Sequence, residues 1–293
     1  MEFRILQYFL AVVREGSISA AAKSLHMTQP TLSTQIKNLE VELGKQLFIR
    51  GSKRVTLTEE GKLFQKRAEE IVALVMKTQS EISHDYIGGD LYIGGGESQS
   101  MRFVIKCIHE FKQDYPTVQT HLYSGNTFDT LEKLDNGLLD FAVIINAPDM
   151  DKYESLKLPV ANVMGLLMHK DSSLAQNDAV TPVDLKDIPL MMGRNYATKQ
   201  TISNWIDYDF EMLNIVARFN LMFNGALMVE EGMGYATSFE GLIPITEDSA
   251  LCFKPFKPQL LADVYLVWKR HQHFSPAGKK FLDHIVKEVK KQA

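Results

Sequence analysis

The sequence of 293 residues lacks several features, and each absence narrows the class of protein. Its two cysteines, Cys107 and Cys252, lie far apart and have no partner at the spacing of a metal or redox motif. We therefore expect a reducing, cytoplasmic compartment. No run of 18 apolar residues occurs, so no membrane-spanning helix is predicted. The apolar start is broken by Arg4, Gln7 and Arg14 and has no small-residue cleavage site, so we expect no signal peptide.

Local patterns for catalysis, metal binding and dinucleotide binding are also missing. His271 and His273 form a His-x-His pair, but no further ligands accompany them in the sequence. The glycines at 94–96 do not extend to a G-x-G-x-x-G motif, because Gln99 occupies the last glycine position. No nucleophile has a histidine and a carboxylate nearby in the sequence. We therefore predict no enzyme, no metal site and no cofactor, although a triad assembled only in three dimensions stays open.

The net charge of −4 hides an uneven distribution. Residues 1–62 hold nine Lys or Arg and six Asp or Glu, which gives +3 and leaves −7 for the remainder. A basic front on an acidic body favours contact between the front and a polyanion. Chance is the alternative, since three charges over 62 residues are a small excess.

Residues 1–58 predict three short helices followed by a β-hairpin. Apolar spacing predicts a first helix over 3–15 that ends at Gly16. Ser17 or Ser19 caps the second, and Thr28 caps the third, with Pro30 in its first turn, where a missing N–H costs nothing. The expected buried stripe of the third helix is Leu32, Ile36, Leu39 and Leu43, and Gly44 ends it. "KQLFIR" and "KRVTLT" then read as two strands of a small wing.

The exposed face of the third helix carries short, hydrogen-bonding side chains. Such residues let a helix approach base edges in the major groove of DNA, where a glutamine bonds adenine and hydroxyls bond bases or phosphates. Basic residues beside the wing suit phosphate or minor-groove contacts. The predicted DNA contacts are Thr28, Gln29, Pro30, Thr31, Ser33, Thr34, Lys37, Arg50, Lys53 and Arg54. A plain solvated face is the alternative, but it does not explain cap, turn, polar face and basic wing in this order.

A long helix is expected next. Thr58 caps it, and apolar residues recur at steps of three and four up to about residue 85, which gives a rod of about 40 Å. The expected seam is Phe64, Ala68, Ile71, Val75, Thr78 and Ile82. A narrow seam on a long helix favours a partner helix, so we predict a homodimer through it. "IGGD" at 87–90 is the expected hinge at its end.

The pattern after residue 90 alternates between strands and helices. Strands are expected at 91–96, 118–124, 140–145, 162–169, 188–193, 215–221, 234–239 and 260–268, and helices at 101–115, 127–137, 198–208, 223–232 and 275–292. This alternation is typical of α/β folds with a mainly parallel sheet. Two such sets in succession favour two lobes around a cleft for a small ligand.

Residues 1–62 resemble the winged helix-turn-helix of the LysR-type transcriptional regulators. The matching positions are Ala21-Ala22, Leu25-His26, Gln29-Pro30, Leu32-Ser33, Gln35-Ile36, Leu39-Glu40, Leu43-Gly44, Leu47-Phe48 and Arg50. Two positions depart from the family pattern, since many members carry Ser at the place of Thr28 and Arg or Lys at that of Thr34. The second change removes a cation from the reading helix.

The resemblance implies a complete domain organisation. It comprises a winged helix-turn-helix domain at 1–58, a linker and dimerisation helix at 59–87, and a periplasmic-binding-protein-like effector domain of α/β class at 88–293. Lobe one covers about 90–161 and 266–293, lobe two about 162–265, with crossovers near 160–162 and 264–266. The implied partners are double-stranded DNA, a small-molecule effector and further copies of the chain, as a dimer or tetramer; RNA polymerase is a further candidate.

The resemblance also places the effector between the lobes, at strand ends and helix starts. The expected contacts are Ser98, Ser100, Asn126, Thr127, Asn146, Arg194, Asn195, Phe223 and Asn224. Ser98 or Ser100 is expected to cap the helix that follows, which would leave free N–H groups for an anion. Arg194 suits a carboxylate effector, with an ordinary surface arginine as the alternative.

Three functions are compatible with these observations. The first is a sequence-specific transcriptional regulator controlled by the effector. The second is a regulator whose cleft is vestigial and which binds DNA without effector. The third is a two-lobed solute-binding protein or enzyme, which predicts an export signal or a local catalytic motif, and the sequence has neither.

Overall fold

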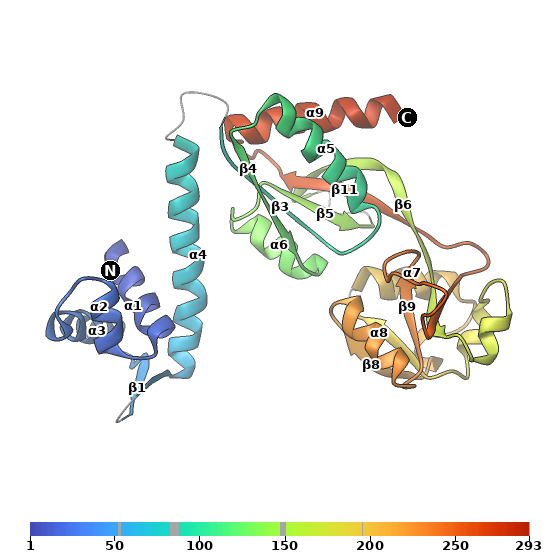
Figure 1. Cartoon of the computed structure of the whole chain (residues 1–293), viewed down its shortest axis with the longest axis horizontal. Coiled ribbons are helices and arrows are strands. Elements are labelled where there is room, and N and C mark those ends of the chain that lie inside the picture. Colours follow the sequence, from blue (N-terminus) through green and yellow to red (C-terminus); the bar gives the residue numbers. More distant parts are fainter. Residues whose placement is uncertain (52–53, 83–87, 147–150, 195, 293) are drawn as a thin grey trace. The chain divides into compact units, whose positions relative to one another are not determined.

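The computed structural model describes residues 1–51, 54–82, 88–146, 151–194 and 196–292 (Figure 1). It divides into two compact units, Met1–Ser83 and His84–Ala293. The first contains helices and one hairpin, and the second contains the large sheet. No helix in the described part of the chain combines the length and the apolar character needed to cross a bilayer.

The first unit has the predicted order of elements. It comprises α1 (Phe3–Glu15), α2 (Ile18–Ser24), α3 (Gln29–Leu43), β1 (Phe48–Arg50), β2 (Val55–Leu57) and α4 (Glu59–Ile82). Gly16 and Gly44 end α1 and α3 in left-handed conformation, with φ of 62° and 64°, as expected. Ser17 caps α2 by accepting from the Ala20 N–H, so Ser17 and not Ser19 is the cap. Thr58 Oγ1 accepts from the Gly61 N–H at 2.9 Å, which confirms the cap of α4.

Phe9 is the centre of the first core. Its side chain is fully buried, and its ring lies 5.0 Å from the ring of Phe48 and 4.8 Å from that of Phe64. The wing and α4 are therefore packed on the same residue of α1. The predicted buried stripe of α3 is confirmed at Leu32, Ile36 and Leu39, but Leu43 is 40% exposed because the helix ends there at the surface.

The predicted seam of α4 is wrong in one respect. Phe64, Ala68 and Val72 pack on the core of the first unit, so the front of the seam is occupied within the chain. Ile71 and Ile82 of the predicted seam are exposed, and so are Leu63 and Leu74, which are not part of it. Successive spacings of eight, three and eight residues keep these four on one side of the helix, and we call them the α4 stripe. The helix end expected near residue 85 lies outside the described residues.

The second unit follows the predicted alternation with two additions. Its elements are β3 (Gly89–Gly95), α5 (Met101–Asp114), β4 (Val118–Ser124), α6 (Thr127–Asp135), β5 (Phe141–Ile145), β6 (Tyr153–His169), β7 (Leu190–Gly193), α7 (Tyr196–Trp205), β8 (Ile215–Phe219), α8 (Met222–Glu230), β9 (Tyr235–Phe239), β10 (Leu251–Pro255), β11 (Leu261–Lys269) and α9 (Pro276–Gln292). The pattern of the sequence does not predict β10 or the first half of β6. Gly89 and Asp90 belong to β3, so the expected hinge at 87–90 is wrong at these two residues.

The sheet is mixed, not mainly parallel as predicted. Its strand order is β4-β3-β5-β11-β6-β9-β7-β8, and β10 pairs with β6. β3 is parallel to β4 and β5, and β7 is parallel to β8 and β9, as a βαβ pattern requires. The pairs that involve β6 and β11 are antiparallel.

The two long strands β6 and β11 join the two lobes. The first half of β6 pairs with β11, and its second half pairs with β9 and β10. β11 pairs with β5 from Val264 onward and carries an irregularity in register between Asp263 and Tyr265. In lobe one, α5 and α9 cover one face of the sheet and α6 the other (Figure 1). A second core forms around β7, α7 and the second half of β6.

Candidate nucleic-acid interface and ligand cleft

The N-terminus of α3 is fixed by its own hydroxyl groups. Thr28 Oγ1 accepts from the Thr31 N–H at 3.4 Å and lies 2.7 Å from Thr31 Oγ1. Because both threonines are exposed, this pair orders the first turn without removing it from the surface. The cap predicted at Thr28 is confirmed.

The predicted reading face of α3 is accessible. Gln29, Ser33 and Lys37 follow one another at four-residue steps, so they lie along one side of the helix. Gln29, Pro30, Thr34 and Lys37 are exposed, and Ser33 is half-buried. The buried stripe of α3, which packs in the core of the first unit, lies about a quarter turn around the helix from this row. The helix therefore presents short polar groups outward, as a DNA-reading helix requires.

His26 determines the turn between α2 and α3. Its φ of 54° places it in the left-handed region, which few residues other than glycine adopt. The Met27 N–H that follows donates to Ala22 O at 2.8 Å. This compact turn connects α2 to α3 and gives His26 a structural role.

The wing is attached to α3 by one carboxylate. Glu40 Oε1 accepts from the Leu47 N–H at 2.8 Å and from the Phe48 N–H at 3.1 Å. The Val55 N–H donates to Gly16 O at 2.9 Å, which ties the second strand of the wing to the end of α1. Of the predicted basic contacts, Arg54 is exposed and Arg50 ends β1, whereas Lys53 lies outside the described residues.

A cavity of about 110 Å³ lies between the two lobes of the second unit. It lies where β3, β7 and β8 end, the edge at which open α/β sheets bind ligands. Its walls combine an apolar body with a few polar groups. The lining residues are Gly96, Glu97, Gly125, Asn126, Thr127, Val143, Ile145, Met164, Gly193, Arg194, Phe219, Asn220, Leu221, Met222, Thr237, Ser238, Phe239 and Leu242.

The predicted effector residues fall into three groups. Asn126, Thr127 and Arg194 line this cavity. Ser98 and Phe223 line an adjoining, wider groove of about 840 Å³ along the start of α5. Neither set of lining residues includes Ser100, Asn146 or Asn224, and Asn195 lies outside the described residues.

The hydroxyl of Ser100 bonds to another side chain and not to the first turn of α5. Ser100 is 5% exposed, and its hydroxyl donates to Asn162 Oδ1 at 2.7 Å instead of capping α5. This hydrogen bond connects the start of α5 with β6. The expected cap by Ser100 is therefore wrong. Asn146 likewise donates from its side-chain amide to Thr201 Oγ1 at 3.2 Å, with a φ of 69°.

Asn126 is held firmly at the start of α6. Its Oδ1 accepts from the Asp129 N–H at 3.0 Å, and its Nδ2 donates to Asp129 Oδ2 at 2.8 Å. The side chain is thus fixed as a cap at the point where the N-terminus of α6 reaches the cavity wall.

Several residues that line the cavity are not among the predicted contacts. Thr237 and Ser238 lie inside β9 and are only 6% and 5% exposed. In the sequence, these two residues are an adjacent polar pair within an otherwise apolar strand. Because burial of a polar group without a partner costs free energy, such a pair indicates a candidate binding site. Glu97 and Asn220 follow the ends of β3 and β8 closely, but no local pattern distinguishes them from neighbours such as Ser98.

Family comparisons agree with both parts of this description. The sequence model described as "Bacterial regulatory helix-turn-helix protein, lysR family" matches residues 3–62. The model described as "LysR substrate binding domain" matches residues 84–290. The two matches fall on the first and second structural units.

Individual relatives and a solved structure agree with these family matches. The chain is 27% identical to the uncharacterized HTH-type transcriptional regulator YnfL of Escherichia coli strain K12, with 99% of each protein covered. It is 30% identical to the HTH-type transcriptional regulator BsdA of Bacillus subtilis strain 168, over 74% of this chain and 75% of that protein. Its fold matches full-length CbnR, solved in complex with its target DNA, with a TM-score of 0.74, 20% identity and complete coverage of both chains.

Proposed function

The chain belongs to the LysR family of transcriptional regulators, and we propose that α3 and the wing read its operator while a small carboxylate binds between the lobes. As a member of this family it has a helix-turn-helix DNA-binding domain and a domain for a small-molecule effector. The proposal concerns which residues perform each task.

One observation carries the assignment for DNA. Gln29, Ser33 and Lys37 form one row along α3 that reaches the surface, about a quarter turn around the helix from the stripe that packs in the core. Gln29 suits a bidentate bond to adenine, and Ser33 suits a base or phosphate. Arg54 supplies a charge beside the wing that is independent of base identity.

Binding to DNA at several salt concentrations tests this assignment. The full-length chain is titrated onto a labelled duplex from its own upstream region and onto a scrambled duplex of equal length. We expect preference for the first duplex and a linear fall of log affinity with log salt. Arg54→Ala should lower the affinity for both duplexes alike and reduce the slope of log affinity against log salt by about one. Equal affinity for the two duplexes across all salt concentrations would contradict the assignment.

The cavity supports a small, partly apolar carboxylate as effector. Arg194 provides a cation, and Asn126 holds the N-terminus of α6 at the wall, which favours an anion. Val143, Met164 and Leu242 provide apolar surface. A cavity of about 110 Å³ is of the order of one that accommodates benzene, so the buried part of the ligand is small.

The proposal also includes a symmetric dimer of the chain, formed through α4. The α4 stripe is exposed, with Leu63 at 63% and Ile82 at 79%, and a second copy of α4 would cover it. Two-fold pairing would present two reading helices to related half-sites. A regulator of bacterial genes meets its operator in the cytoplasm, and further pairing to a tetramer and contact with RNA polymerase belong to the same proposal.

A further inference from the structure

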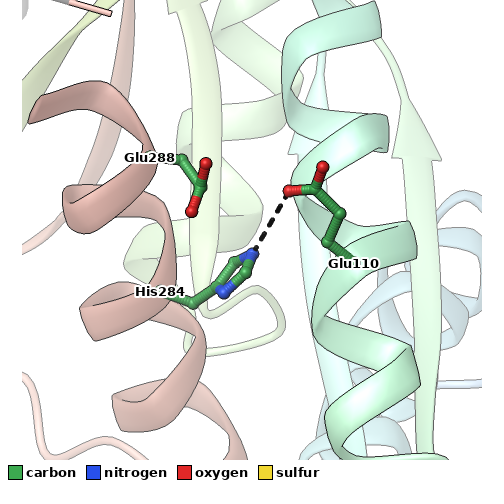
Figure 2. Close-up of side chains that lie close together, drawn as sticks. All are labelled: Glu110, His284 and Glu288. Carbon is green, nitrogen blue, oxygen red and sulfur yellow. Dashed lines mark ion pairs between the residues drawn. The ribbon is translucent and has the colours of Figure 1, made fainter. Parts of the chain in front are cut away.

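Three metal-ligating side chains meet between α5 and α9, on the far side of lobe one's core from α6. Glu110 comes from α5, and His284 and Glu288 come from α9 (Figure 2). His284 and Glu288 are four residues apart, so they lie on the same side of α9. α5 and α9 pack against each other, which brings Glu110 to face both (Figure 2).

The ligand atoms are close to coordination distance. The nitrogen of His284 and one carboxylate oxygen from each glutamate all lie within 4.8 Å of one another. His284 Nε2 is 3.9 Å from Glu110 Oε2. Two ligands about 2.1 Å from a tetrahedral ion are about 3.4 Å apart, so His284 and Glu110 need to approach by about 0.5 Å and any other pair by at most about 1.4 Å. Rotation of a glutamate side chain supplies such a movement.

One nitrogen of the His284 imidazole, Nε2, has no hydrogen bond in the described part of the chain. The side chains of His284 and Glu288 are 17% and 14% exposed, and that of Glu110 is 35% exposed. His284 Nε2 is buried and has no hydrogen-bond partner among the described residues, since 3.9 Å is too long for one. Buried polar atoms without a partner are rare in proteins, and coordination of a metal ion satisfies such a nitrogen.

One oxygen of Glu288 already has a partner, because Lys291 Nζ donates to its Oε1 at 2.5 Å. A bound ion would use the other oxygen of this carboxylate or replace the lysine. Cys107 lies one turn before Glu110, and burial raises the pKa of its thiol to about 12, with further contributions from Glu110 and Glu288. The thiol is therefore protonated, and we do not count it as a ligand.

We propose that Glu110, His284 and Glu288 form a binding site for a divalent transition-metal ion of the Zn²⁺ class. One imidazole nitrogen with two carboxylate oxygens is a ligand set that such ions accept, and the imidazole disfavours Mg²⁺ and Ca²⁺. Three protein ligands leave a fourth position for water. A bound ion would fasten α9 to α5, the helix that begins shortly after the cleft residues Gly96 and Glu97.

Titration of the untagged full-length chain, freed of metal by a chelator, tests this site. ZnCl₂ is added in a calorimeter, and CoCl₂ is added in parallel so that its absorption spectrum reports the ligand geometry. We expect one ion per chain and a higher unfolding temperature with metal. His284→Asn and Glu110→Gln should each weaken Zn²⁺ binding by about tenfold or more and abolish the thermal shift.

Matched substitutions separate this site from other histidines. His109→Asn changes an exposed histidine on α5 next to Glu110, and a double His271→Asn, His273→Asn variant removes the His-x-His pair. Both should bind Zn²⁺ like the intact chain. Circular dichroism without metal checks that every variant folds, and Glu288→Gln replaces any that does not. Absence of stoichiometric binding to the intact chain, or unchanged affinity in the His284→Asn and Glu110→Gln variants, would overturn the proposal.

Discussion

Gln29 is the first residue of α3, and its side chain is exposed on the proposed reading face. Gln29→Ala removes the amide that would bond adenine. Because a bidentate contact contributes about 1–3 kcal/mol of discrimination, operator affinity should fall by roughly 5- to 150-fold. Affinity for the scrambled duplex and the unfolding temperature should stay unchanged. Fluorescence anisotropy with both duplexes measures the difference.

Gln35 provides the control for this prediction. It is also an exposed glutamine of α3, but it lies on another side of the helix, away from Gln29 and Ser33. Gln35→Ala should leave operator affinity intact. If Gln35→Ala and Gln29→Ala lower operator affinity equally, the proposed reading face lies on the wrong side of α3.

Glu40 stabilises the first unit through two main-chain hydrogen bonds from the start of the wing. Hydrogen bonds to a charged group contribute about 1.5–3 kcal/mol, so Glu40→Ala should lower the free energy of unfolding by that order. Glu42 pairs with the N-terminal amine at 2.7 Å but is 54% exposed, and a surface pair contributes about 0–1 kcal/mol. Urea denaturation of Glu40→Ala and Glu42→Ala compares them. A larger loss for Glu42→Ala would refute this role of Glu40.

At the scale of whole elements, the sequence predicts helices better than strands. Ser17, Thr28 and Thr58 predict helix starts from the local sequence, because the hydroxyl of each accepts a hydrogen bond from an N–H in the first turn. The first half of β6 and the short β10 carry no such signal. The first half of β6 forms a strand because it pairs with β11, more than 90 residues later in the chain, and its exposed Glu154 interrupts the apolar pattern. Whether such a segment becomes a strand depends on its tertiary pairing and not on its local sequence.

The α4 stripe is the surface through which we propose that the chain assembles. Leu74 is 41% exposed within the α4 stripe, whereas the adjacent Ala73 is exposed on another side of the helix. Leu74→Lys would bury a charge in the proposed dimer contact and should shift the chain toward monomer. Ala73→Lys adds the same charge away from it and should leave the dimer intact. Sedimentation equilibrium over a range of concentrations measures both; an intact Leu74→Lys dimer would mean that another surface joins the copies.

For the whole molecule, the two kinds of site differ in how much the sequence reveals. The proposed DNA-reading face lies within one helix, so a period of 3.6 alone predicts which residues share it. The cleft draws on residues from Gly96 to Leu242, and the chain's strand ends predict its edge but not which side chains point inward. Ser100 illustrates the limit. It precedes α5 as predicted, but its hydroxyl donates a hydrogen bond to Asn162 on β6, which the sequence does not reveal. Glu110 and His284 meet although 174 residues separate them, and no local spacing shows such a pair.

The proposed contact between Arg194 and a carboxylate predicts that the charge of the effector affects the stability of the protein. The guanidinium of Arg194 is exposed at the cavity, and the main-chain N–H of this residue is fixed by donation to Phe219 O at 3.0 Å. Small carboxylates and their uncharged amides are compared by thermal shift. A carboxylate present at 100 times its Kd adds about 2.7 kcal/mol, which raises the unfolding temperature by roughly 5–10 °C. Arg194→Gln should remove the preference for carboxylate over amide.

Arg218 offers a matched substitution for this last test. It is an exposed arginine on β8 that does not belong to the lining residues of the cavity. Arg218→Gln makes the same loss of charge and should keep the preference for carboxylates, because only the charge at the cavity distinguishes acid from amide. If Arg218→Gln and Arg194→Gln lose the preference together, the discrimination comes from the net charge of the domain. If neither loses it, the N-terminus of α6, held by Asn126, is sufficient to bind the anion.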